Sequence, residues 1–153
     1  MIPLRGSAEI VTRLEVAGAR RLLAVDVPGE LAAILRNAAP PDALVTAEGR
    51  AIRSVKDTFD WILLWQESRV GSRALFDAAV KRLEPDGRLW VATAMKKVQG
   101  PKTPAAQRLE AADLEKAFTK EGLSGGREAR LSAWHVAYGF ARPAGAATRS
   151  PRS

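Results

Sequence analysis

Apolar and polar positions follow one another along the chain in blocks that predict strands and helices in turn. Residues 22–27 (LLAVDV), 59–66 (FDWILLWQ) and 88–94 (RLWVATA) are short runs with apolar residues on both parities. Such runs are typical of strands covered on both faces, as in a parallel sheet. They predict buried central strands, and the shorter run at residues 43–47 predicts one more.

Between these strands, apolar residues recur at helical spacing. The clearest case is residues 72–83 (SRALFDAAVKRL), where Leu75, Ala79 and Leu83 share one face. The other helical segments that the spacing predicts are residues 7–17, 30–37 and 111–121. Residues 50–58 (RAIRSVKDT) fit either a short helix or an irregular connection.

Strands alternate with helices as far as residue 121, and two further strand segments then follow one another, at residues 129–131 and 134–141. This order predicts an α/β fold with a doubly wound, mostly parallel sheet, crossover helices on both faces and an antiparallel C-terminal strand pair. A chain of 153 residues fits one domain. We expect that domain over residues 1–142 and a disordered basic tail over residues 143–153 (PAGAATRSPRS).

The composition removes several classes of function. The chain has no cysteine, which excludes disulfides and thiolate metal ligands or nucleophiles. Its single histidine, His135, argues against a histidine-rich metal site or a Ser-His-Asp triad, and we expect a structural role for it. No apolar run approaches the roughly 20 residues that span a bilayer. The N-terminus lacks the apolar core of a signal peptide, so we expect a cytoplasmic protein without a membrane partner.

The formal net charge of +7 raises the question of a nucleic-acid partner. Three of the positive charges are arginines in the last twelve residues, which contain no acid. The rest of the chain is therefore only mildly basic, and a charge of that size also serves solubility.

The order FDWILLWQ, helix, LEPDGRLWVAT, helix, hairpin resembles the class I S-adenosylmethionine methyltransferases. In that fold a Leu-x-Pro-Gly-Gly turn precedes the fifth strand, and LEPDG at residues 83–87 matches it with one change. The chain is also similar, over residues 7–142, to a family of short bacterial proteins of unknown function that look like trimmed methyltransferases. Those proteins share the D-W-I-L-L strand, the P-D-G-x-L-W-V turn and strand, a following Lys-Lys and a late tryptophan strand.

The resemblance implies a cofactor site beyond the carboxyl ends of the strands. The first strand should end in an acid and a Gly-x-Gly turn, and the second in a carboxylate that binds the ribose hydroxyls. The fourth should end in a polar residue that faces the cofactor or substrate. The positions that this implies for cofactor binding are Asp26, Gly29, Glu48 and Gln66, with Glu67 next to the last. The first turn reads DVPGE, where Pro28 removes one amide and only one glycine is present, which argues against S-adenosylmethionine binding.

The length of one connection also argues against S-adenosylmethionine binding. Only about eleven residues, 49–59, separate the second strand from FDWILLW. Class I methyltransferases have a further helix and strand there, which help to wall the cofactor pocket. The missing unit favours a binding module over a transferase.

Tryptophans and lysines supply two further candidate sites. Trp61 and Trp65 share one parity of their strand, and the four tryptophans of the chain could form a surface for a flat ligand or simply belong to the core. We expect core, with Trp65 as the exception because it lies near a strand's carboxyl end.

Lys96, Lys97 and Lys102 lie around one loop at the functional edge of the predicted sheet, where they could bind phosphate, a nucleotide or an acidic partner. The alternative is an ordinary solvated loop.

Three hypotheses follow. The first is a non-catalytic methyltransferase-like domain, without catalytic residues or metal ligands, that binds a small ligand or a protein, a second copy of itself included. The second is an S-adenosylmethionine-dependent methyltransferase with a degenerate glycine loop, using Asp26, Glu48 and Gln66. The third is an RNA- or DNA-binding accessory protein that uses the lysine loop and the arginine tail.

Overall fold

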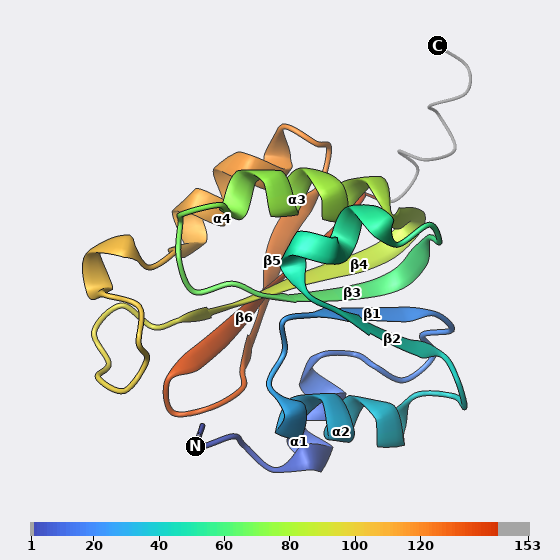
Figure 1. The fold of residues 1–153 in the computed structure, drawn as a ribbon, viewed down its shortest axis with the longest axis horizontal. Helices are drawn as coiled ribbons and strands as arrows, with labels where there is room; N and C mark the ends of the chain where they lie inside the picture. Colours follow the sequence, from blue (N-terminus) through green and yellow to red (C-terminus); the bar gives the residue numbers. More distant parts are fainter. Residues whose placement is uncertain (1, 144–153) are drawn as a thin grey trace.

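One sheet of six strands organises residues 2–143, the part of the chain that the computed structural model describes (Figure 1). The strands are β1 (Leu22–Val25), β2 (Leu44–Ala47), β3 (Phe59–Trp65), β4 (Leu83–Ala94), β5 (Ser124–Arg130) and β6 (His135–Ala141). Their order in the sheet is β2-β1-β3-β4-β6-β5. The four strands from β2 to β4 are parallel, and β6 runs antiparallel to both β4 and β5. The predicted fold class is confirmed. The expected tail lies outside the described residues, apart from Pro143.

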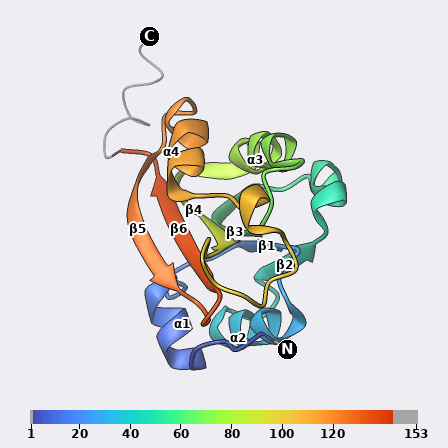
Figure 2. The ribbon, with the colours of Figure 1, turned by 90° about the vertical axis from the view of Figure 1, so that its left-hand side faces the viewer.

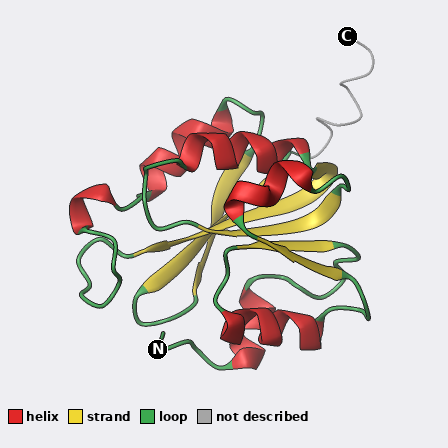
Figure 3. Cartoon of the chain, viewed as in Figure 1, coloured by secondary structure: helices red, strands yellow, loops and turns green. Residues whose placement is uncertain are grey.

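Helices cover both faces of this sheet. They are α1 (Ser7–Arg13), α2 (Gly29–Ala38), α3 (Ser72–Lys81) and α4 (Ala111–Thr119), with the 3₁₀ helices η1 (Gly49–Ser54) and η2 (Ala105–Gln107). Figure 2 shows the layers from the side, with α3 and α4 on one face and α1 and α2 on the other; Figure 3 separates helices from strands by colour. Since the helices after β1 and β3 cover opposite faces, the topology reverses between these neighbouring strands. This is the switch point at which doubly wound sheets bind ligands.

The alternation of side chains along β3 divides the core into two clusters. Ile62 and Leu64 pack into the cluster under α3 and α4, whereas Trp61 and Leu63 pack into the cluster over α1 and α2. Trp61 and Trp90 are each only 1% exposed, which confirms them as core residues. The indole N–H of Trp61 donates to the backbone carbonyl of Leu14 at 2.9 Å. No helix within residues 2–143 has the length and hydropathy needed to cross a bilayer.

The connection between β2 and β3 is the single 3₁₀ helix η1, so β2 is an edge strand of the described sheet. The expected absence of a further helix and strand in this interval is confirmed for the residues described.

Several element boundaries differ from those that the periodicity predicts. The helix expected at residues 7–17 ends at Arg13, and the strand expected at residues 22–27 ends at Val25, because Asp26 adopts a left-handed conformation with φ of 57°. The LEPDG segment lies inside β4 instead of before it. Leu83 pairs with Phe59 and Arg88 with Trp61, so the residues between them form a bulge in the strand.

Candidate functional site

Two hollows flank the first turn of α2, which begins beside the switch point. The first, which we call the edge groove, has a volume of about 680 Å³ and lies between α2 and the carboxyl ends of β1 and β2. Its lining includes Asp26, Gly29, Arg36, Thr46 and Glu48. The fold therefore brings together three of the four positions that the resemblance implies for a cofactor.

Both carboxylates of the edge groove already have partners. Asp26 accepts a hydrogen bond from the backbone N–H of Gly49 at 3.0 Å. Glu48 pairs with Arg50 at 2.9 Å, and their side chains are 65% and 85% exposed. An ion pair so exposed is worth at most about 1 kcal/mol, so a ligand can displace the arginine.

Pro28 is the N-cap residue of α2, with φ of −59°. The first backbone bond of the helix runs from the N–H of Ala32 to the carbonyl of Pro28. An N-cap residue contributes its carbonyl to the helix rather than its N–H, so proline is tolerated at this position. No described side chain caps α2, which leaves the amides of Gly29 and Glu30 without such a partner. The proline therefore removes one amide from the loop but not those of the first helical turn.

Gln66 lies apart from the edge groove. Its side-chain amide donates to the backbone carbonyls of Ser68 at 2.8 Å and Val70 at 3.3 Å, within the connection that leads into α3. This local role accounts for a polar residue at the end of β3 without any ligand.

The second hollow, which we call the tryptophan pocket, has a volume of about 620 Å³. Its lining includes Glu30, Trp65, Glu67, Lys102, Trp134 and His135. These residues come from α2, the end of β3, the loop after β4 and the β5–β6 turn. The pocket therefore collects segments far apart in the sequence at the carboxyl end of the central strand, and Trp65 is half-buried there, as expected.

A buried hydrogen-bond chain fixes one carboxylate of this pocket. His135, 1% exposed, lies with Nε2 at 2.6 Å from Glu67 Oε2 and Nδ1 at 3.0 Å from Ser132 Oγ. Ser132 Oγ accepts the backbone N–H groups of Trp134 and His135, both at 2.9 Å. These two bonds occupy its lone pairs, so the hydroxyl hydrogen is directed at Nδ1. We therefore assign the ring hydrogen to Nε2, which donates to Glu67.

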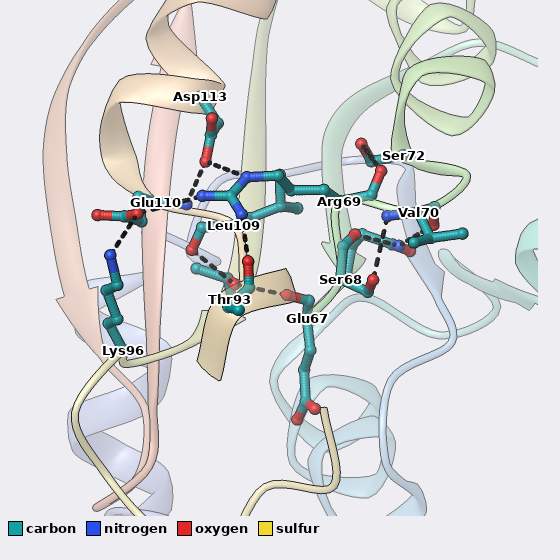
Figure 4. A network of polar contacts seen from close by, with 12 residues as sticks. Glu67, Ser68, Arg69, Val70, Ser72, Thr93, Lys96, Leu109, Glu110 and Asp113 are labelled. Atoms are coloured by element: carbon teal, nitrogen blue, oxygen red, sulfur yellow. Dashed lines mark hydrogen bonds and ion pairs between the residues drawn. The ribbon is translucent and has the colours of Figure 1, made fainter. Parts of the chain in front are cut away.

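The other oxygen of Glu67 is also held: Oε1 accepts a hydrogen bond from Thr103 Oγ1 at 2.9 Å. The hydrogen bond from His135 lowers the pKa of Glu67 below its ordinary value of 4.5, with a smaller opposing contribution from burial. Glu67 is thus an ionised carboxylate in a fixed orientation, and its side chain points away from the neighbouring Arg69 network (Figure 4).

The Ser132–His135–Glu67 chain has the residue types of a nucleophile, base and acid, but its arrangement excludes that chemistry. Ser132 is 0% exposed and its oxygen is occupied by two backbone amides, so no substrate reaches it. The chain positions Glu67 instead. Sequence reasoning missed this pair, since 68 residues separate the two side chains and no local pattern joins them.

Arg108 anchors the loop that walls the tryptophan pocket. This residue is only 4% exposed, and its guanidinium donates to the backbone carbonyls of Met95 and Val98, both at 2.7 Å, and of Thr103 at 2.8 Å. One side chain therefore holds both ends and the middle of this loop. Sequence analysis did not identify this role, because the three carbonyls that Arg108 binds are brought together only by the folded loop.

The three loop lysines do not share one environment. Lys96 pairs with Glu110 at 3.1 Å, and Glu110 also pairs with Arg69 (Figure 4). Lys97 is exposed, and Lys102 lines the tryptophan pocket. Binding of an anion or of nucleic acid by this loop stays a prediction. Within residues 2–143, no cluster of three or more histidines and acids has the arrangement of a metal site.

Comparison with known proteins places this geometry in a fold class. No protein-family model matches the sequence, and no curated protein matches it. Solved structures do match. An S-adenosylmethionine-dependent methyltransferase from Aquifex aeolicus aligns with a TM-score of 0.66 at 11% identity, over 88% of this chain and 88% of that chain.

Two further matches were solved with S-adenosylhomocysteine (SAH). The N-methyltransferase NodS of Bradyrhizobium japonicum aligns with a TM-score of 0.63 at 14% identity, over 90% of this chain and 85% of that chain. PigF aligns with a TM-score of 0.62 at 14% identity, over 89% of this chain and 60% of that chain. At such identities the likeness concerns the fold, which is a trimmed form of the class I methyltransferase fold.

Proposed function

We propose that this chain is an S-adenosylmethionine-dependent methyltransferase that binds its cofactor in the edge groove. The observation that carries the proposal is the convergence of Asp26, Gly29 and Glu48 on one hollow beside the uncapped first turn of α2. Carboxylates at the ends of adjacent parallel strands, next to free helix amides, suit a ligand with both hydroxyls and a charged amino-acid end.

Each group of the groove then has a defined task. Glu48 would accept hydrogen bonds from the ribose hydroxyls, and Asp26 would face the positively charged end of the ligand. The amides of Gly29 and Glu30 would donate to its carboxylate. The cofactor itself would supply an electrophilic methyl group on a sulfonium. The fold shared with NodS and PigF, both solved with SAH, supports this placement.

A second candidate function, that of a non-catalytic small-ligand module, is favoured by a different observation. The described sheet has no strand outside β2, so the edge groove is open along one side. Water then reaches a bound ligand, and exclusion of water is one of the conditions that favour group transfer. Under this second candidate function, the edge groove would bind its ligand without group transfer.

Titration with SAH tests the proposal. At about a hundred times its Kd, such a ligand adds roughly 2.7 kcal/mol to the free energy of unfolding. For a chain of this size we expect Tm to rise by roughly 5 to 10 °C. Glu48→Ala should weaken SAH binding roughly tenfold to a hundredfold, because it removes an acceptor that is ionised.

Asp57→Ala is the matched control, since Asp57 pairs with Arg21 at 2.8 Å and is 59% exposed, much as Glu48 pairs with Arg50. It should bind SAH as the wild type does. Absence of any thermal or calorimetric response in the wild type would overturn cofactor binding. If SAH binds, release of SAH from S-adenosylmethionine in the presence of a metabolite extract distinguishes the transferase from the non-catalytic module.

A further inference from the structure

The two indole rings that line the tryptophan pocket are held firmly. Trp134 covers Gly100 so closely that a Cβ on this glycine would lie 2.4 Å from the ring, and Gly100 has φ of 129°. Trp65 packs on His135 with ring centroids 4.5 Å apart. Both rings thus have a close neighbour, and both are only partly buried where they line the pocket.

The loop that carries Gly100 is fixed as well. Arg108 holds its backbone through three short hydrogen bonds, and Thr103 joins it to Glu67. These contacts within the protein hold the loop that forms the pocket wall, so the pocket exists before any ligand binds. A preformed hollow binds more tightly than one that must be ordered on binding.

The charge around the pocket is mainly negative. Glu67 is ionised and fixed by His135, and Glu30 contributes a second carboxylate from the first turn of α2. The opposing positive charge is Lys102, whose side chain is exposed at the loop. His135 adds none in the assigned tautomer, since Nδ1 accepts from Ser132.

We propose that the tryptophan pocket binds a small organic cation, an alkylated ammonium group, against the indoles of Trp65 and Trp134 with Glu67 as its counter-charge. Tryptophan faces attract such cations more strongly than other side-chain rings do, and a nearby carboxylate adds direct Coulomb attraction. A volume of about 620 Å³ fits a small metabolite.

This inference does not depend on cofactor binding. The first turn of α2 separates the two hollows, with Gly29 in the lining of the edge groove and Glu30 in that of the tryptophan pocket. A failed SAH titration would leave the cation site standing, and the reverse also holds.

The test compares choline with its neutral carbon analogue, in which a tert-butyl group replaces trimethylammonium. The indole N–H resonances of the four tryptophans report binding in heteronuclear NMR spectra. Choline in the millimolar range should shift the resonances of Trp65 and Trp134. Those of Trp61 and Trp90, each 1% exposed, should stay in place as internal references. The neutral analogue should shift none of them at the same concentrations.

Charge variants identify the counter-ion. Glu67→Gln keeps the side-chain shape and should weaken choline binding roughly tenfold. Glu30→Gln, which leaves the contact between Glu67 and His135 intact, should weaken it by a smaller factor and keeps the test valid if the first variant unfolds. Glu115→Gln, on the exposed side of α4, is the control and should bind like the wild type.

Lys102→Ala should strengthen choline binding a few-fold at low salt, because it removes the exposed positive charge of the pocket lining, and the gain should vanish at high salt. Three results would overturn the proposal: no shift of Trp65 or Trp134 with choline, equal shifts with the neutral analogue, or wild-type affinity in both Glu30→Gln and Glu67→Gln.

Discussion

The two hollows beside the first turn of α2 differ in how their carboxylates are held. In the edge groove, Glu48 is paired with Arg50, and both side chains are largely exposed. In the tryptophan pocket, Glu67 is fixed by the buried His135, and the wall is anchored by the buried Arg108. A ligand in the edge groove must fix the exposed side chains of Glu48 and Arg50 when it binds. The tryptophan pocket is organised before a ligand binds. Buried polar contacts, more than the position of an acid at a strand end, therefore distinguish a preformed site.

The largest expected effect comes from removing the anchor of the tryptophan pocket. Arg108→Met keeps the apolar stem but leaves the carbonyls of Met95, Val98 and Thr103 without their donor. Each unsatisfied buried carbonyl costs about 1 to 3 kcal/mol, partly relieved by water, so we expect a loss of about 3 kcal/mol in the free energy of unfolding. Urea denaturation measures the loss, and hydrogen exchange should show faster opening of residues 95–103.

Arg73→Met is the control for this change, because Arg73 is an exposed residue of α3. Surface substitutions of this kind usually change stability by less than about 0.5 kcal/mol. If Arg108→Met were no more damaging than Arg73→Met, the loop would not depend on this guanidinium, and the contrast between the two hollows would disappear.

A smaller effect is expected from the carboxylate itself, and it depends on pH. The pKa of Glu67 is lowered in the folded protein, chiefly by the hydrogen bond from His135. The unfolded chain therefore binds the proton more readily. The stabilisation by Glu67 is fully present above its ordinary pKa of 4.5 and is lost as the pH falls through the lower folded value.

Glu67→Gln has no such titration at residue 67. At neutral pH we expect the variant to be less stable than the wild type by about 1.5 to 2 kcal/mol, the lower part of the range for a hydrogen bond to a charged group. The difference should shrink as the pH drops below 4.5, measured as the free energy of unfolding by urea at several pH values. A difference that is constant across this range would mean that the hydrogen bond from His135 does not stabilise the ionised form.

A comparison of β3 with β5 shows what sequence patterns can and cannot predict. The run FDWILLWQ at residues 59–66 predicted β3 (Phe59–Trp65) to within one residue, because a strand buried on both faces is apolar at nearly every position. β5 (Ser124–Arg130) was predicted only at its end, since Ala129 is its one buried residue and two glycines interrupt its apolar pattern. A strand buried on both faces can be predicted from its own residues. An exposed strand that forms because it pairs with a neighbouring strand cannot.

The candidate sites follow the same rule. Asp26 and Glu48 were identified because each lies at the carboxyl end of a predicted strand, and adjacent parallel strands end at one edge. The contact of His135 with Glu67 depends on β6 lying next to β4, a pairing decided by the whole sheet. No spacing in the sequence indicates that pairing. Trp65, Glu67 and Lys102 were named separately as candidates, but their convergence with His135 on one hollow was not predicted.

The smallest expected effect concerns the edge groove, and it tests whether Glu48 is available to a ligand. Arg50→Ala removes an exposed ion pair and should change the free energy of unfolding by less than about 1 kcal/mol. In the wild type, a ribose can bind Glu48 only after the ion pair with Arg50 breaks. If Glu48 binds the ribose of a cofactor, Arg50→Ala removes that cost, and SAH should bind a few-fold more tightly in calorimetry. Arg53→Ala, a second exposed arginine of η1, is the matched control and should leave SAH affinity unchanged.

Weaker binding in Arg50→Ala would show the opposite: that the arginine, not the carboxylate, contacts the ligand. The edge groove would then be a site for anionic groups, and the two hollows would differ in the sign of the charge they bind as well as in their order.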